Sequence, residues 1–350
     1  MSITISGANA GKTEPEVIPL YRAAADGRSI CMVCPHHCKL GSGQVGRCGV
    51  RVGIAGGVEP TTSQVFATHG LTHVEDHPLF HFYPGMKTFG IGTIGCNAAC
   101  HFCQNWELAL VHRTRATWRA RAIFNTAEQI VEAALLHGVE AITFTYNEPT
   151  VWPEAIISVA NAARAAGLRV ILATNGFLSS QTLHMLLPYL DAVKIDLKGP
   201  DNESYRNLAG IHLEPVLSTM RELRAAGVWL EVSTVVVPVA GDRTIPIAAM
   251  AQHILTQTGA ITPWHLMRFF PAYRMLALAP GDVEELRVLR SRAMSEGLKF
   301  VYISNVPDLP ERNTSCPKCG SVVGQRSLGL PSTLGAQCGL CGENIPGRFS

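Results

Sequence analysis

The chain has 350 residues, of which 47% are hydrophobic and 16% are charged, and its formal net charge is +2. This composition excludes a disordered chain, because it is too hydrophobic and too weakly charged, and the balanced charge gives no sign of nucleic-acid binding. No apolar run is long enough for a membrane span, and the first residues lack the apolar segment of a secretory signal. We therefore expect a cytoplasmic protein whose 11 cysteines hold metal rather than form disulfides.

The cysteines form three groups along the chain, two of four and one of three. A set of four is typical of a closed site in which every ligand comes from the protein, whereas a set of three leaves one position open. The sequence therefore predicts two closed metal sites and one site that an outside molecule can reach.

The first group lies in a metal-binding segment predicted over residues 26–84, after a flexible tail at residues 1–25. A glycine-rich stretch in that tail, GANAGKT, is one residue too short for a phosphate-binding loop. The spacers between the four cysteines are two, three and nine residues long: Cys31, Cys34, Cys38 and Cys48. Four thiolates this close suit either zinc or an auxiliary iron–sulfur cluster, and both stay open.

Four histidines in the same segment recur at every fourth residue: His69, His73, His77 and His81. On a helix they would form a metal-binding stripe. Gly70 and Pro78 argue against one continuous helix. We therefore interpret the region as a loop with scattered histidines and assign them no role.

The second group follows a strand predicted over residues 87–94, which is apolar, β-branched and bounded by glycine. Its members are Cys96, Cys100 and Cys103. Three thiolates within eight residues can bind three irons of a [4Fe–4S] cluster and leave the fourth iron open. The glycines of residues 90–95 also spell GxGxxG, but Arg115 stands where a dinucleotide site needs an acidic residue. We interpret these glycines as giving the backbone room beside the cluster.

Downstream, apolar strands alternate with helices, which is typical of a parallel sheet buried on both faces. Strands are predicted over residues 141–145, 168–174, 192–197, 228–237, 264–269 and 298–303. Helices are predicted over residues 125–137, 149–166, 179–187, 245–258 and 282–296, with further helical residues ending at Gly227. About six repeats predict an α/β fold with an incomplete (β/α)6-type TIM barrel over residues 85–305.

Polar residues follow several of these strands, at the edge where barrels form their active sites. They are Asn147 and Glu148 in TYNEP, Asn175 in ATNG, Asp196 and Lys198 in KIDLKG, and Arg268 and Tyr273 in RFFPAY. Each residue alone is typical of a turn or a helix cap. Because several lie in register with the cysteine loop, we expect them to share one site with it.

The third group lies in a zinc-ribbon-like module predicted over residues 310–350. Two CxxC pairs are separated by an 18-residue spacer: Cys316, Cys319, Cys338 and Cys341. Such pairs are typical of structural zinc sites. A short segment with few apolar residues needs a metal of this kind to fold.

The CxxxCxxC spacing of the central cysteines, with Phe102 before the last one, resembles the radical S-adenosylmethionine (SAM) enzymes. In that family the three cysteines hold a [4Fe–4S] cluster whose open iron binds the amino and carboxylate groups of SAM. For such a ligand, Glu148 would accept hydrogen bonds from the ammonium group and Lys198 would bind the carboxylate. Asn147, Asn175 and Asp196 complete the predicted cofactor site, the last two facing the ribose hydroxyls. Arg268 and Tyr273 remain candidates for catalysis.

Residues 87–303 resemble the branch that contains the glycyl-radical-enzyme activases, such as the pyruvate formate-lyase activating enzymes. Those have SGGEP and DTNG where this chain has TYNEP and ATNG. Over the whole chain, the blocks CxxCPHxC, PLFHFYPG, GCNAACHFCQN and PWHLMRFFPAY and the terminal CPxCG…CxxCG are similar to the radical SAM enzymes of the AmmeMemoRadiSam system. The name of that system reflects a genomic association with AMMECR1-like and Memo-like proteins, which this resemblance implies as partners.

The resemblance implies an enzyme that forms a 5′-deoxyadenosyl radical and abstracts hydrogen from an unidentified substrate. A flavodoxin- or ferredoxin-like protein would supply the electron. Three alternatives stay open: an activase acting on a partner protein, an enzyme that transfers the aminocarboxypropyl group of SAM, and a non-catalytic zinc-ribbon interaction protein.

Overall fold

The computed structural model describes residues 19–61, 66–110, 123, 126–238, 246–327 and 332–349. Most of the tail predicted over residues 1–25, with its GANAGKT stretch, lies outside the described residues. So do Arg115 and the predicted first residues, 125 and 245, of two helices.

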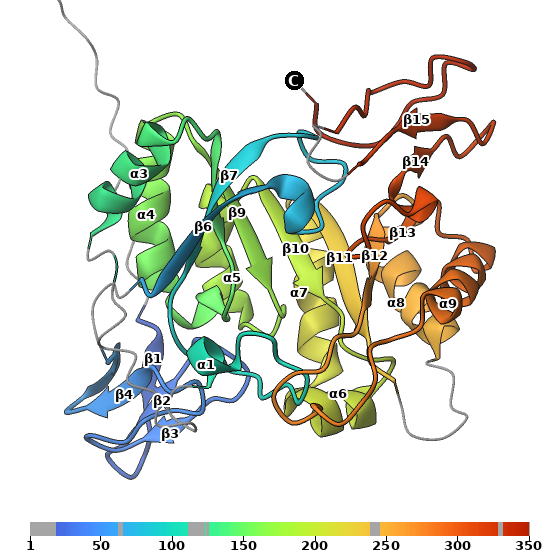
Figure 1. Cartoon of the computed structure of the whole chain (residues 1–350). Helices are drawn as coiled ribbons and strands as arrows, with labels where there is room; N and C mark the ends of the chain where they lie inside the picture. Colours follow the sequence, from blue (N-terminus) through green and yellow to red (C-terminus); the bar gives the residue numbers. More distant parts are fainter. Residues whose placement is uncertain are drawn as a thin grey trace, which may run out of the picture.

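The centre of the fold is an eight-stranded sheet in the order β13-β12-β11-β10-β9-β8-β7-β6 (Figure 1). From β7 to β13 each strand pairs in parallel with the next one along the chain. These strands are β7 (Lys87–Gly92), β8 (Ala141–Phe144), β9 (Arg169–Thr174), β10 (Ala192–Asp196), β11 (Trp229–Val236), β12 (Trp264–Arg268) and β13 (Val301–Ile303). The predicted α/β fold with an incomplete barrel is confirmed.

The edge strand β6 (Thr68–His73) is a feature that the sequence analysis missed. It runs antiparallel to β7, with pairs from Thr68 opposite Gly92 to His73 opposite Lys87. The prediction of a loop was therefore wrong for His69 and His73, which lie on this strand. A short 3-10 helix, η1 (Val74–Asp76), follows, so the four histidines share no helix. The strand was hard to recognise because its residues are polar and only partly buried.

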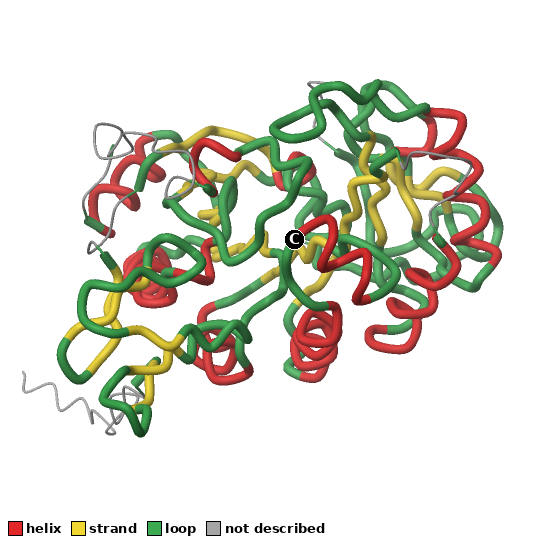
Figure 2. The backbone as a smooth tube through the Cα atoms, turned by 90° about the horizontal axis from the view of Figure 1, so that it is seen from below, coloured by secondary structure: helices red, strands yellow, loops and turns green. Residues whose placement is uncertain are grey.

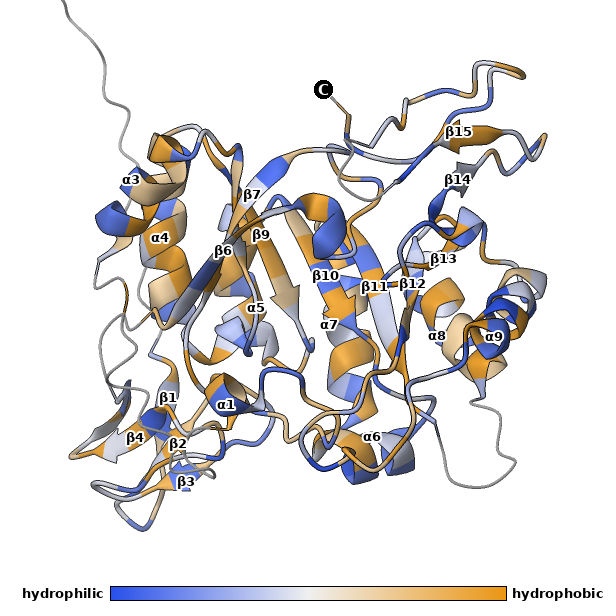
Figure 3. Ribbon diagram, in the orientation of Figure 1, coloured by the Kyte–Doolittle hydropathy of each residue, from blue (hydrophilic) through white to orange (hydrophobic). Residues whose placement is uncertain are grey.

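Helices connect the parallel strands and cover the outside of the curved sheet (Figure 2). They are α3 (Ala127–Leu136), α4 (Pro153–Ala165), α5 (Ser180–Leu186), α6 (Asn202–Ala209), α7 (Leu213–Ala225), α8 (Ile247–Thr258) and α9 (Val283–Ser295). The helical residues predicted to end at Gly227 form two helices, because Gly210 ends α6 at a φ of 67°. Hydrophobic residues run along α4, α7 and the neighbouring strands (Figure 3) and form one large core between helices and sheet.

Two small modules flank the barrel (Figure 1). The N-terminal module contains β1 (Tyr21–Ala23), β2 (Ser29–Cys31) and β3 (Lys39–Leu40) in one sheet and β4 (Arg51–Ile54) with β5 (Gly57–Pro60) in another. It lies near α1 (Trp106–Ala109), at the carboxyl ends of the parallel strands. The C-terminal module contains η5 (Pro310–Arg312), β14 (Thr314–Ser315) and β15 (Val322–Gly324), and lies at the opposite end.

Buried polar groups close the amino ends of β11 and β12. The His265 Nε2 atom lies 2.7 Å from Glu231 Oε2, and both side chains are fully buried. Glu231 also accepts hydrogen bonds from the backbone N–H groups of Phe80 and His81, and His81 Nδ1 donates to the carbonyl of Pro346. Burial alone would raise the pKa of Glu231, yet its bond to His265 holds that pKa below the usual value. These buried contacts close the barrel at the amino ends of its strands, opposite the carboxyl ends.

None of the helices in the described ranges combines the length and apolar character that crossing a bilayer requires.

Candidate cluster and cofactor site

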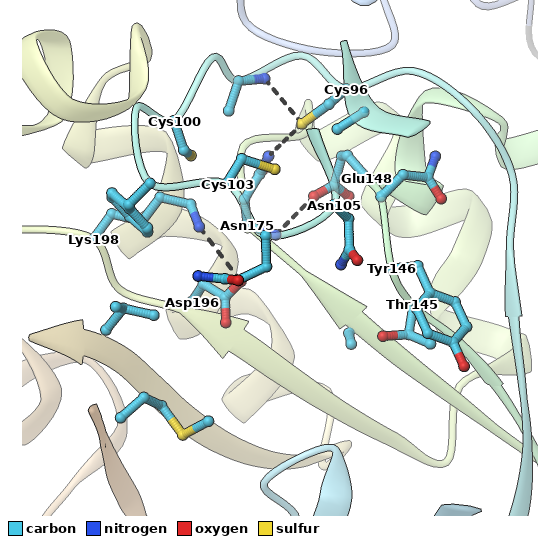
Figure 4. Close-up of a pocket in the computed structure, with 18 of the residues that line it drawn as sticks. Cys96, Cys100, Cys103, Asn105, Thr145, Tyr146, Glu148, Asn175, Asp196 and Lys198 are labelled. Atoms are coloured by element: carbon cyan, nitrogen blue, oxygen red, sulfur yellow. Dashed lines mark hydrogen bonds and ion pairs between the residues drawn. The ribbon is translucent and has the colours of Figure 1, made fainter. Parts of the chain in front are cut away.

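A cavity of about 290 Å³ lies at the carboxyl ends of the strands. It is lined by the three central cysteines, Cys96, Cys100 and Cys103, and by most of the polar residues predicted from the sequence: Asn147, Glu148, Asn175, Asp196, Lys198 and Arg268. In Figure 4, Glu148 and Asn175 lie next to the cysteines, whereas Tyr146 lies farther from them. The structure thus brings these predicted residues together at one cavity, with the exception of Tyr273.

The loop that carries the cysteines is held by its own backbone. The Ala98 N–H donates to Cys96 Sγ at 3.3 Å, and the Cys103 N–H donates to the Cys100 carbonyl at 3.3 Å. Burial raises the pKa of all three thiols. Bound iron would therefore be needed to keep them as thiolates, which fits a cluster-binding loop.

Of the three glycines in the GxGxxG pattern, Gly92 makes room for Thr68 and Tyr146 rather than for the cluster, since a Cβ there would lie 2.7 Å from Thr68 Cγ2 and 3.0 Å from the Tyr146 ring. A Cβ on Gly90 would make an ordinary contact with the Tyr146 hydroxyl at 3.4 Å. Tyr146 itself has a φ of 71°, an uncommon conformation for a bulky residue. Only Gly95, with a φ of 84°, lies directly beside a cluster cysteine. Our interpretation of Gly92 was therefore wrong, because the packing of Tyr146 could not be read from the sequence.

Glu148 is a buried carboxylate, 2% exposed, at the start of the segment after β8. It accepts hydrogen bonds from the hydroxyls of Thr150 and Thr174, each at 2.7 Å, and from the Asn175 N–H at 2.7 Å. Burial raises the pKa of Glu148 although these bonds oppose the shift. A ligand cation beside it would favour the ionised form, as a SAM ammonium group would.

Asp196, at the end of β10, lies between two lysines. It accepts from the ammonium groups of Lys194 and Lys198 and, at 2.6 Å, from the hydroxyl of Ser233. Burial alone would raise the pKa of Asp196, but the two ammonium groups hold it well below its usual range. Burial likewise opposes the charge of Lys198, while the Cys100 and Asp196 groups raise the pKa of this lysine.

Lys194, which was not among the predicted residues, lines the same cavity with a side chain only 12% exposed. Its position two residues before Asp196 on a strand could have revealed it, because residues i and i+2 point to the same face.

The two predicted asparagines hold the cluster loop. Asn147 Nδ2 donates to the Gly95 carbonyl at 2.9 Å, and Asn147 Oδ1 accepts from the backbone of Thr93. Asn175 Nδ2 donates to Asn97 Oδ1 at 2.8 Å and lies 3.9 Å from Cys96 Sγ. Their side chains thus connect the strand ends to the cysteines.

The two candidates for catalysis lie in different places. Arg268 lines the cavity, and its Nε donates to the Gly281 carbonyl at 2.7 Å. Tyr273 does not line the cavity, and its ring stacks on Trp106 with centroids 5.6 Å apart. Only Arg268 is therefore placed to contact a molecule bound inside.

The C-terminal quartet is compact. The Sγ atoms of Cys316, Cys319, Cys338 and Cys341 all lie within 4.8 Å of one another, with two pairs at 3.6 Å. Four sulfurs about 2.3 Å from a zinc ion would be about 3.8 Å apart. Across the described ranges, these cysteines are the one group of potential metal ligands packed this closely.

Residues 91–249 match the radical SAM superfamily. This range of the chain is therefore a radical SAM domain. It is 32% identical to MJ0808, an uncharacterized protein of Methanocaldococcus jannaschii, over 93% of this chain and 97% of that protein. It is 25% identical to the benzylsuccinate synthase activating enzyme of Thauera aromatica, over 37% of this chain and 39% of that protein.

Among solved structures, a domain of a pyruvate-formate lyase-activating enzyme from Bacteroides vulgatus is similar. Its TM-score is 0.39 at 18% identity, covering 47% of this chain and 98% of that domain. The family match and the sequence similarities, without this structure, support the predicted radical SAM superfamily and a relationship to glycyl-radical-enzyme activases. Membership of the AmmeMemoRadiSam system stays a prediction.

Proposed function

We propose that this protein is a radical SAM enzyme that cleaves SAM reductively and uses the resulting 5′-deoxyadenosyl radical to abstract hydrogen from a substrate. The observation that carries the proposal is the convergence of three cysteines, a buried carboxylate and a buried lysine on one cavity. When bound by Cys96, Cys100 and Cys103, a [4Fe–4S] cluster supplies the single electron that breaks the C5′–S bond of SAM.

The side chains around the cavity fit the amino acid part of SAM. Glu148 would accept from its ammonium group, because this carboxylate is buried beside the cysteine loop. Lys198 would donate to its carboxylate, because its ammonium group lies in the same cavity. Asp196 and Asn175 face the position proposed for the ribose, and Asn147 orients the loop through Gly95.

Exclusion of water from the radical depends on the rest of the barrel. A primary carbon radical attacks the nearest C–H bond, so the cavity must hold the substrate close and keep other molecules out. The buried contacts of Glu231 and His265 seal the opposite end. Arg268 lies at the cavity wall, where we propose that it contacts the substrate.

We further propose that the C-terminal quartet binds zinc, because its sulfur spacing matches a zinc tetrahedron. Radical SAM enzymes need an external electron donor, and a flavodoxin- or ferredoxin-like protein is the proposed one. Partnership with AMMECR1-like and Memo-like proteins and a cytoplasmic location stay predictions.

The similarity to an activating enzyme of benzylsuccinate synthase favours a second candidate function. An activase would abstract hydrogen from a glycine of a partner protein and leave a glycyl radical there, instead of abstracting hydrogen from a small substrate. Its signature would be SAM cleavage stoichiometric with a persistent glycyl radical in the partner.

The proposed function is tested by anaerobic incubation of the reconstituted protein with SAM and dithionite, followed by mass analysis of the nucleosides. We expect 5′-deoxyadenosine from the wild type and none from Cys96→Ala. Methylthioadenosine would instead indicate aminocarboxypropyl transfer. A wild-type protein that binds no iron would contradict the proposal and favour a non-catalytic interaction protein.

A further inference from the structure

The N-terminal cysteines surround a small cavity of their own. Cys31, Cys34, Cys38 and Cys48 all line it, and three of them are buried while Cys38 is half-buried. They come from the end of β2, the following turn and the loop before β4. Four thiols around one cavity are a ligand set whose metal the sequence leaves undecided.

The spacing of the sulfurs separates this quartet from the C-terminal one. Within the described part of the chain, only the C-terminal cysteines have ligand atoms all within 4.8 Å of one another. The N-terminal thiols are spread more widely than the edges of about 3.8 Å that a zinc tetrahedron requires. A [4Fe–4S] core needs this wider spacing, because four irons and four sulfides lie between the thiolates.

The buried cation Arg51, which lines the same cavity, independently indicates that this cavity binds an anionic group. Arg51 is 2% exposed, lines the cavity, and donates through Nη1 to both carboxylate oxygens of Glu154 at 2.9 Å. Its Nε is buried and finds no acceptor among the described residues. A buried donor without an acceptor destabilises the fold. The sulfur atoms of a negatively charged cluster would accept this hydrogen bond.

The quartet is also connected to the central cysteines. The Cys96 N–H donates to the Cys48 carbonyl at 3.1 Å, so one hydrogen bond links a ligand of each site. A Cβ on Gly95 would lie 2.6 Å from the same carbonyl, so this close approach requires glycine. His36 Nε2 donates to the Asn97 carbonyl at 2.8 Å and joins the two loops a second time.

We propose that Cys31, Cys34, Cys38 and Cys48 hold a second [4Fe–4S] cluster through which electrons reach the cluster at Cys96, Cys100 and Cys103. One electron at a time would pass from a low-potential donor of the flavodoxin or ferredoxin class, which is oxidised, to the N-terminal cluster and then to the central one. The half-buried Cys38 marks the side from which the donor approaches. The electron route rests on the proposed function, whereas the presence of the second cluster does not.

Metal analysis of the anaerobically reconstituted full chain tests the second cluster. We expect about eight irons and one zinc per wild-type chain, and about four irons in the triple variant Cys96→Ser/Cys100→Ser/Cys103→Ser. That variant should still show the electron paramagnetic resonance signal of a reduced cluster. Four irons and two zincs in the wild type, or no iron in the triple variant, would overturn the proposal. Mössbauer spectra of the wild type count the clusters independently of whether any variant folds.

The electron route has its own readout in Cys31→Ser/Cys34→Ser. We expect this variant to keep about four irons and to cleave SAM with dithionite but not with reduced flavodoxin. Cleavage by flavodoxin at the wild-type rate would overturn the route. The wild type with dithionite tests the proposed function separately, because its failure to cleave SAM leaves the iron count unaffected.

The hydrogen bond from Arg51 can be examined by redox titration. Arg51→Lys keeps the charge but removes the Nε–H, and we expect a lower midpoint potential for the N-terminal cluster alone. Arg28→Lys is the matched control, because Arg28 is an exposed residue of the same module paired with Asp26. Equal potentials in Arg51→Lys and the control would show that Arg51 does not contact a cluster.

Discussion

Replacing Glu148 by glutamine removes one charge at the centre of the proposed SAM site while keeping the size of the side chain. In the structure, the Glu148 carboxylate accepts from Thr150, Thr174 and the Asn175 backbone, and it is the buried acid beside the cysteine loop. Glutamine offers one acceptor oxygen and turns an NH2 group toward these donors or toward the SAM ammonium.

The magnitude follows from the hydrogen bond that would be lost. A bond between charged groups contributes about 1.5–3 kcal/mol, which corresponds to about a tenfold to 150-fold increase in the Kd for SAM. The cysteine loop is held separately through Asn147 and Gly95, so the iron content of the cluster should be unchanged.

Titration calorimetry of SAM against the reconstituted protein, with parallel iron analysis, measures both quantities. Glu132→Gln is the matched control, because Glu132 is an exposed acid on α3, away from the cavity. A Glu148→Gln protein with full iron content and an unchanged Kd for SAM would refute the placement of the ammonium group at Glu148.

Three further predictions concern the stability of the fold. A Cβ at Gly92 would lie 2.7 Å from Thr68 Cγ2, so Gly92→Ala should destabilise the protein by about 1–3 kcal/mol in urea unfolding. Gly335→Ala is the control and should not destabilise the protein, because a Cβ at Gly335 would have its nearest neighbour at 3.9 Å. Burial lowers the pKa of His77 and His81 to about 4. As the pH falls, the unfolded chain therefore binds protons at these histidines before the folded protein does. The free energy of unfolding should fall between about pH 6.5 and 4, by about 3 kcal/mol per histidine. A urea midpoint that stays constant across this pH range would contradict the prediction. Chelation of zinc should make residues 310–350 sensitive to protease while the iron content stays constant, and unchanged proteolysis would argue against a structural zinc there.

The groups of cysteines were recognisable from the sequence because each group is local. Cys96, Cys100 and Cys103 lie within one loop, and the CxxC pairs of the C-terminal module need only a tight turn to bring two sulfurs together. The parallel strands were also predictable, since continuous burial on both faces produces uninterrupted apolar runs such as β8.

The elements that the sequence did not reveal depend on partners far along the chain. Strand β6 has few apolar residues and is a strand because it pairs with β7. The space at Gly92 is filled by Thr68 and by Tyr146, the latter more than fifty residues later in the chain. Neither relation leaves a pattern in its own segment.

The sequence by itself therefore determined which cysteines are grouped, how strands and helices alternate, and which superfamily the motifs indicate. Only the tertiary structure decided which polar groups meet: Ser233 on Asp196, His265 on Glu231, and the Cys48 carbonyl on the Cys96 N–H. The physical reason is that spacing and periodicity act over a few residues, whereas buried polar contacts are selected by packing between distant segments. Such contacts form where folding excludes water from both a donor and an acceptor, so that the two groups must bond to each other.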